Sequence, residues 1–113
     1  MIYVKINNTL YPAAISGKLN DTAWGGRSSK TIRLTMSAVN AASLFVDDAP
    51  WSIIEEHEYI DENEVTQTTQ VEYDNSEYCV AGDITDHRDG TVSVKMGKVT
   101  DREMIDIITG GAL

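Results

Sequence analysis

The 113-residue chain has few of the features that point directly to a class of protein. It has one cysteine, Cys79, which excludes an internal disulfide bond and a zinc site built from several cysteines. It contains no apolar run near the ~18 residues that a membrane-spanning helix needs. Its first residues alternate between apolar and polar side chains, unlike a signal peptide. We therefore expect a single domain over residues 1–113 from a reducing, intracellular environment.

Basic residues are also scarce, because nine Lys and Arg face eighteen Asp and Glu and give a net charge of −9. This balance disfavours direct binding to nucleic acid, which needs positive charge, and binding to an anionic membrane surface. The charge is unevenly spread, since residues 47–89 contain fourteen acidic residues and one basic residue, Arg88. A chain polarised in this way can stack on copies of itself or present its acidic part to a basic protein surface.

Alternating apolar residues between turn signals predict strands that are joined as hairpins. The strongest turn signals are Asn7-Asn8, Asp61–Glu64 and Asp89-Gly90. Ser37 and the capping box Thr100–Glu103 predict the starts of two short helices. The expected fold is therefore α+β, with a mainly antiparallel sheet of about seven strands and two short helices. A small barrel and a sandwich are both open as arrangements of that sheet.

Two segments are candidate interaction sites. The first is Trp24-Gly25-Gly26-Arg27, in a stretch over 16–29 that is predicted to be a loop. Trp and Arg dominate interface hot spots, but Trp24 covering the core is an equally good interpretation. The second is the acidic segment 55–70, interpreted as a hairpin projecting from the core or a strand pair at a sheet edge. The expected contact residues are Trp24, Arg27, Glu55, Glu56, His57, Glu58, Glu62 and Glu64.

No set of residues predicts catalysis. The segment Asp83–Asp89 has four side chains that could hold a hard cation, but their spacing does not match the calcium-loop pattern. A hairpin turn explains that segment better. Cys79 lies between apolar residues, where a free cysteine behaves as a small hydrophobic residue. The sequence therefore predicts neither an enzyme nor a site for a metal or another cofactor.

A further observation concerns the pattern over nearly the whole chain. It is carried by Tyr11-Pro12-Ala13, Trp24–Lys30, Leu44–Asp47, Trp51–Ile53, Tyr73–Tyr78, Ala81–Asp86, Asp89–Val92 and Met96–Lys98. In these stretches the chain resembles short prophage-encoded proteins of Gram-positive gut bacteria. The resemblance implies a phage context, commonly among genes for virion morphogenesis. It implies no catalytic or ligand-binding residues.

Charge and resemblance together lead to two functional hypotheses. The first is a non-enzymatic phage protein that acts through protein–protein contacts, as a tail or head–tail structural component that associates with itself. The alternative is a small acidic inhibitor that imitates a nucleic-acid backbone and occupies the basic channel of a host defence nuclease such as a CRISPR effector. Either protein would be found in the bacterial host cytoplasm, in the virion, or in both.

Overall fold

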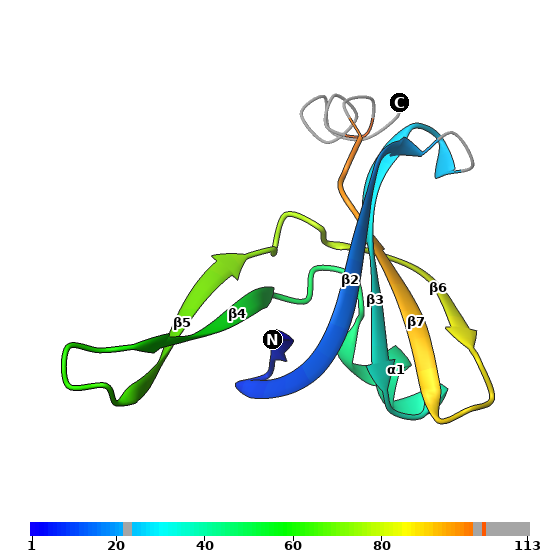
Figure 1. Ribbon diagram of the computed structural model, residues 1–113. Helices are drawn as coiled ribbons and strands as arrows, with labels where there is room; N and C mark the ends of the chain where they lie inside the picture. The colour runs from blue at the N-terminus through cyan, green and yellow to red at the C-terminus, as the bar shows by residue number, and fades with distance from the viewer. Residues whose placement is uncertain (22–23, 101–102, 104–113) are drawn as a thin grey trace.

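The computed structural model describes residues 1–21, 24–100 and 103, and its strands form one open sheet in the order β5-β4-β1-β2-β3-β7-β6 (Figure 1). Every neighbouring pair of strands is antiparallel. The prediction of an α+β fold with a mainly antiparallel sheet of about seven strands is therefore confirmed. The barrel alternative is wrong because the outermost described strands, β5 and β6, are not neighbours, and one continuous sheet takes the place of the two sheets of a sandwich. The elements are β1 Ile2–Ile6, β2 Thr9–Asp21, β3 Arg27–Thr35, α1 Ala38–Leu44, β4 Trp51–Ile60, β5 Thr66–Asp74, β6 Val80–Asp86 and β7 Thr91–Gly97.

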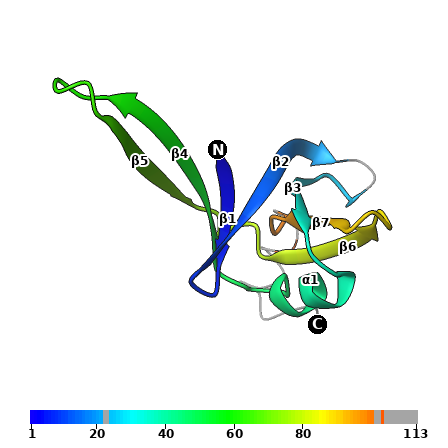
Figure 2. The same cartoon turned by 60° about the horizontal axis from the view of Figure 1, so that its bottom comes forward.

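Strand β2 joins two halves of the sheet because it changes its partner part-way along. Its residues 9–12 pair with β1, and its residues from Ala13 onward pair with β3. Pro12, which cannot donate a backbone hydrogen bond, lies at the last pair with β1. The two halves diverge from this point, as Figure 2 shows. We call the β4–β5 hairpin, residues 51–74, the arm, and we call the other strands together with α1 the body.

The predicted loop over residues 16–29 is wrong, because most of it is strand. Gly17 pairs with Lys30 and Lys18 with Ser29, so β2 and β3 continue far beyond the expected ends. Long-range pairing overrides the local turn preference of these residues. Turn geometry is retained at Gly25 and Gly26, whose φ angles are 65° and 81°.

The first predicted helix, which was expected to begin after Ser37, is confirmed and spans Ala38–Leu44. The Ser37 side chain accepts a hydrogen bond from the Asn40 N–H at 3.1 Å and caps α1. The Thr100–Glu103 capping box also forms, with a Thr100 N–H to Glu103 Oε1 distance of 2.9 Å. The rest of the second predicted helix lies outside the described residues. Within the described ranges, no helix has the length and apolar character needed to cross a membrane.

The main buried cluster lies on one side of the sheet, which we call the inner face; the opposite side, where Ile54 is buried separately, is the outer face. Alternate residues of the central strands point to the inner face, and α1 lies against β6 and β7. Trp51 at the start of β4 is fully buried there, with its ring 6.5 Å from those of Phe45 and Tyr78. Trp51 therefore anchors the arm in the body. The buried cluster is Val4, Ile6, Ile32, Leu34, Ala41, Phe45, Ala49, Trp51, Tyr78, Val92, Val94 and Met96.

Candidate functional site

The arm extends away from the body, and its distal part is a two-stranded ribbon (Figure 1). Strand β1 follows β4 only as far as Glu55, with a further backbone bond from the Glu56 N–H to Met1 O at 2.9 Å. Residues 57–60 lie beyond β1 and pair with β5. All residues of β5 are exposed. The arm contains eight acidic residues and no Lys or Arg.

The turn of the arm is built around the Asp61 carboxylate. Asp61 Oδ1 accepts hydrogen bonds from the N–H groups of Asn63 at 2.9 Å and Val65 at 3.0 Å. Asp61 Oδ2 accepts a third bond from Gln67 Nε2 at 2.9 Å. The bonds from Val65 and Gln67 lower the pKa of Asp61, because they favour its charged form. These bonds set the turn and with it the register of the arm.

The ladder register assigns each arm residue to one face of the sheet. Ile53 pairs with Tyr73 and, on the other side, with the buried Val4, so these residues share the inner face. Successive residues of a strand point to opposite faces, so this pairing also assigns the remaining arm residues to the inner or the outer face. The inner face of the arm is formed by Ile53, Glu55, His57 and Tyr59 of β4 with Gln67, Thr69, Val71 and Tyr73 of β5.

The predicted contact residues of the arm do not lie on one surface. Glu55 and His57 share the inner face, with Glu55 Oε2 3.3 Å from His57 Nε2. Glu56 and Glu58 lie on the outer face, where Glu56 accepts a hydrogen bond from Gln70 at 2.9 Å. The other two, Glu62 and Glu64, lie in the turn between the strands. The acidic side chains are thus divided between two faces and the tip.

The inner face of the arm carries exposed apolar side chains that sequence reasoning did not select as site residues. The exposed fractions are 52% for Tyr59, 41% for Val71 and 48% for Tyr73. A groove of about 310 Å³ lies where this face meets the body. In the sequence, the alternation of Val71 and Tyr73 with polar residues could have revealed this apolar face. Such alternation shows which side chains share a face, but it does not show whether another layer covers them. The groove is lined by Lys30, Ile53, Glu55, Tyr73, Asp74, Asn75 and Glu77.

Two lysines give the body positive charge beside this groove. Lys30 Nζ lies 4.7 Å and Lys98 Nζ 5.2 Å from the centre of the Tyr78 ring. Lys30 also donates a hydrogen bond to Asn75 Oδ1, and Lys98 is 3.4 Å from Glu77. Partial burial lowers the pKa of Lys30, while the nearby Glu77 carboxylate opposes this change.

Trp24 lies on the outer face of the body, away from the buried cluster. A Cβ added at Gly97 would meet the Trp24 ring at 2.8 Å, and one at Gly82 would meet it at 2.7 Å. The neighbouring Met96 points into the core, so the Gly97 side of β7 is the outer face. Arg27 Cζ and Lys95 Nζ each lie 5.0 Å from the ring centre. Trp24 therefore covers the back of the sheet and does not fill the core.

Arg27 connects this arrangement to the last described residue. Its Nη1 donates to Lys98 O at 2.6 Å and lies 2.8 Å from Glu103 Oε1. Its side chain is only 10% exposed. The hydrogen bond from Arg27, with one from the Thr100 N–H, lowers the pKa of Glu103 to about 2. The structure thus places Arg27 in an internal contact and leaves little of it for a partner.

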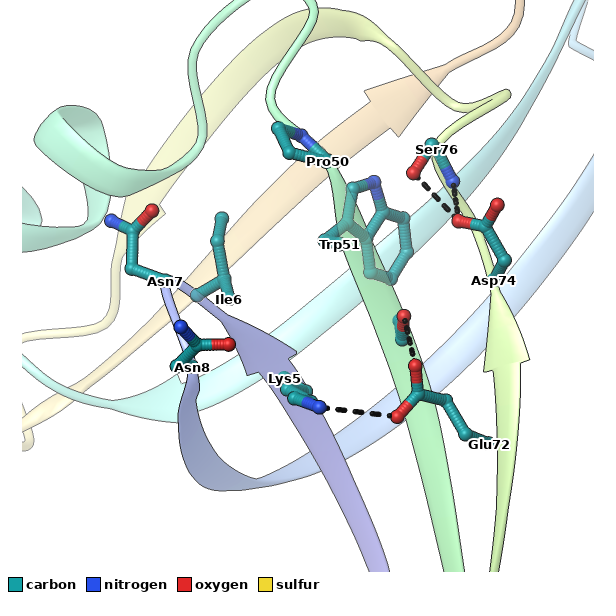
Figure 3. Close-up of a pocket in the computed structure, with 10 residues that line it drawn as sticks. Lys5, Ile6, Asn7, Asn8, Pro50, Trp51, Glu72, Asp74 and Ser76 are labelled. Carbon is teal, nitrogen blue, oxygen red and sulfur yellow. Dashed lines mark hydrogen bonds and ion pairs between the residues drawn. The ribbon is translucent and has the colours of Figure 1, made fainter.

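A cavity of about 530 Å³ lies at the foot of the arm, beside the Asn7-Asn8 turn (Figure 3). Lys5 Nζ and Ser52 Oγ both lie 3.3 Å from the Glu72 carboxylate, and Ser76 donates to Asp74. The hydrogen bonds from Ser76 lower the pKa of Asp74. These polar groups form pairs with each other along the cavity wall, as the dashed lines in Figure 3 show.

The acidic segment near Asp89 has the bonds of a hairpin turn. Asp89 Oδ1 accepts hydrogen bonds from the Oγ1 and the N–H of Thr91, which lower the pKa of Asp89. His87 Nε2 lies 2.7 Å from Ser93 Oγ, and Gly90 has a φ of 89°. Across residues 1–21, 24–100 and 103 there is no group of three His, Cys, Asp or Glu residues that could hold a metal ion.

Comparison with known proteins gives no relative: no family model, curated protein or solved structure matches the chain. The resemblance to prophage-encoded proteins stays a prediction that rests on the stretches quoted above. The features available for a functional proposal are the acidic arm, its half-apolar inner face and the basic strands of the body.

Proposed function

We propose that the protein is a non-enzymatic phage protein that binds other protein surfaces, most simply those of its own copies, as a tail or head–tail structural component. One observation carries this proposal, which is the separation of charge between the arm and two strands of the body. The arm has eight acidic residues and no Lys or Arg, whereas Arg27–Thr35 and Thr91–Lys98 have five Lys and Arg and no acidic residue. Regions of opposite charge on one chain attract when two copies meet.

The architecture of the arm supports a role in assembly. The arm projects far enough to reach a neighbouring molecule, and the molecule measures 65 Å along its longest axis. Among the described strands, its outer strand, β5, has one neighbour, so its other edge has backbone groups that can pair with another strand. The phage context comes from the resemblance, and the virion role follows from joining that context to self-association.

The inhibitor hypothesis is favoured by the outer face and the tip of the arm, which carry most of its carboxylates. Glu56, Glu58 and Glu72 share the outer face, and Glu62 and Glu64 lie in the turn. The half-apolar inner face has no counterpart on a nucleic-acid backbone. For this reason the structural role is the first choice and the inhibitor is the second.

The first experiment is the molar mass of the chain by light scattering over a wide concentration range. We expect a mass that rises with concentration and falls with added salt, because salt screens charges beyond roughly 8 Å at physiological ionic strength. Replacing Lys30 and Lys98 with Glu should weaken the association, while Arg88→Glu, in the β6–β7 turn, is the matched control. A strict monomer at high concentration would contradict the proposal.

A second experiment separates the inhibitor from the structural component. If the chain blocks the basic channel of a nuclease, it should compete with DNA for binding to that nuclease. A triple variant with Glu58→Gln, Glu62→Gln and Glu64→Gln should then lose this competition. Competition by the wild type that these three changes remove would favour the inhibitor. Association of copies that persists in the triple variant would favour the structural role.

A further inference from the structure

The inner face of the arm continues the inner face of the body, but none of the described elements covers it as α1 covers the body. In the body, Ile32 and Val94 of that face are fully buried. In the arm, Tyr59, Val71 and Tyr73 are 41–52% exposed. A two-stranded ribbon is marginally stable by itself, and a half-apolar sheet face is stabilised when a second layer covers it. This face therefore has the properties of one half of an interface.

The order of side chains along β4 makes this face complementary to itself. Ile53, Glu55, His57 and Tyr59 follow each other at intervals of about 6.6 Å on the same face. When a second arm lies over the first in the opposite direction, centred on residue 56, Ile53 faces Tyr59 of the second copy. Glu55 then faces His57 of the second copy. Both contacts occur twice, as a two-fold axis requires.

The same arrangement brings the tip of one arm over the groove where the other arm meets its body. In this register residue 61 of the second copy lies over residue 51, next to Asn75, whose N–H donates to Trp51 O at 2.9 Å. The groove of about 310 Å³ at this position is lined in part by Lys30, and Lys98 lies beside it over Tyr78. The groove also carries the carboxylates of Glu55, Asp74 and Glu77, so the tip approaches a site of mixed charge. The complementarity of the two arms therefore rests on the Ile53–Tyr59 and Glu55–His57 contacts.

We propose that the inner face of the arm is a self-recognition surface, on which two copies of this chain pack their arms face to face and antiparallel. This inference rests on the proposed function, because it names the partner of the arm in self-association. The eight side chains of the face are few compared with the 20–30 residues a side of a standard stable interface. The association is therefore reversible and concentration-dependent.

The first test compares two neighbouring residues of β4 whose side chains point to opposite faces. Tyr59→Ser removes an apolar side chain from the inner face, and Ile60→Ser removes one from the outer face, where Ile60 is 72% exposed. In sedimentation velocity on the full chain, we expect Tyr59→Ser to weaken dimer formation about thirtyfold, the scale of one interface hot spot, and Ile60→Ser to leave it unchanged. Equal effects of the two changes would overturn the proposal. Circular dichroism of each variant checks that the fold is retained.

A second test exchanges the charges at residues 55 and 57 in two separate variants. Recovery of dimers in their mixture requires direct contact between copies. Glu55→Lys places a cation opposite His57 of the second copy, and His57→Glu places a carboxylate opposite Glu55. Each variant alone should dimerise less than the wild type. An equimolar mixture should recover dimers, because the exchanged groups then face each other as opposite charges. A mixture that stays as monomeric as its components would overturn the proposal.

The results also separate this inference from the proposed function. A wild-type chain that is monomeric at every concentration would contradict both. A wild-type chain that associates, loses association with the Lys30 and Lys98 reversals, and is unaffected by Tyr59→Ser would leave self-association standing and overturn packing between arms.

Discussion

The arm and the body are built from the same antiparallel ladder, but within the part of the chain that the structure describes only the body has a second layer on its inner face. Ile32 and Val94 in the body are buried near α1 and Trp51, whereas Tyr59 and Val71 in the arm remain half exposed. Strand alternation therefore decides which side chains share a face, and the covering layer decides whether they are buried. This difference leaves the arm with apolar and acidic side chains that a partner can reach.

The two regions are also held together by different interactions. The body depends on a buried cluster that also holds Trp51, the first residue of the arm, while the distal arm depends on ladder hydrogen bonds and the Asp61 turn. Segments with few buried contacts open locally at a lower free energy than the core. We therefore expect the arm to open without unfolding of the body.

The largest effect is expected from Trp51→Ala. Trp51 is 2% exposed, and its Nε1 donates a hydrogen bond to Tyr78 O at 3.1 Å. Loss of this side chain should lower the free energy of unfolding by about 3–5 kcal/mol, measured by denaturant titration. Tyr59→Ala in the arm, in dilute protein, should change it by less than about 0.5 kcal/mol. Similar losses for the two variants would remove the distinction between body and arm.

The next effect concerns the outer face of the body. Gly97→Ala would place a Cβ 2.8 Å from the Trp24 ring and also against Arg27, so both side chains must move. We expect a loss of about 1–3 kcal/mol in unfolding free energy and a shifted Trp24 indole N–H resonance. Gly17→Ala is the control, because its new Cβ would meet only Ser29 O, at 3.9 Å. An unshifted indole resonance in Gly97→Ala would mean that Trp24 does not rest on Gly97.

A smaller and local effect is expected in the arm. Asp61→Ala removes the acceptor for the N–H groups of Asn63 and Val65, so amide exchange in residues 57–70 should become faster. The melting temperature should change little, since the body does not depend on the turn. Glu62→Ala, which removes a neighbouring carboxylate, is the matched control for charge. A fall in melting temperature as large as that of Trp51→Ala would show that the arm and body unfold as one.

The smallest effect is a pH dependence in the body. The pKa of Glu103 is lowered from 4.5 to about 2 by hydrogen bonds from Arg27 and Thr100. A lowered pKa means that the contact stabilises the fold fully above pH 4.5 and that this contribution is lost as the pH falls toward 2. The melting temperatures of wild type and Glu103→Gln should therefore differ above pH 5 and converge below it. A difference that stays constant down to pH 2 would contradict the lowered pKa.

The sequence predicted the parts of the fold that depend on local patterns. The Asn7-Asn8 turn, the Ser37 cap and the Asp89-Gly90 turn all follow from residue types with known backbone preferences, and each is present. The loop over 16–29 was wrong because pairing of β2 with β3 stabilises a strand that local propensity disfavours.

The candidate site was predicted in composition but not in arrangement. The acidic residues from Glu55 to Glu64 were selected for their charge. The sequence did not show that they are distributed over the inner face, the outer face and the tip of the arm. The sequence also left the position of Trp24 open, because its ring packs over Gly82 and Gly97, which are far from it in the chain. These glycines make room for the Trp24 ring only once the strands that carry them are paired.

The amino-acid sequence by itself determined the uneven charge, the alternation of the strands and the residues that form the tight turns, because these depend on side chains close together in the chain. Tertiary structure alone decided that β2 changes partner, that the sheet stays open, and that α1 covers the body but leaves the arm bare. These outcomes depend on which strands pair over long separations, and alternation of side chains is compatible with several such pairings.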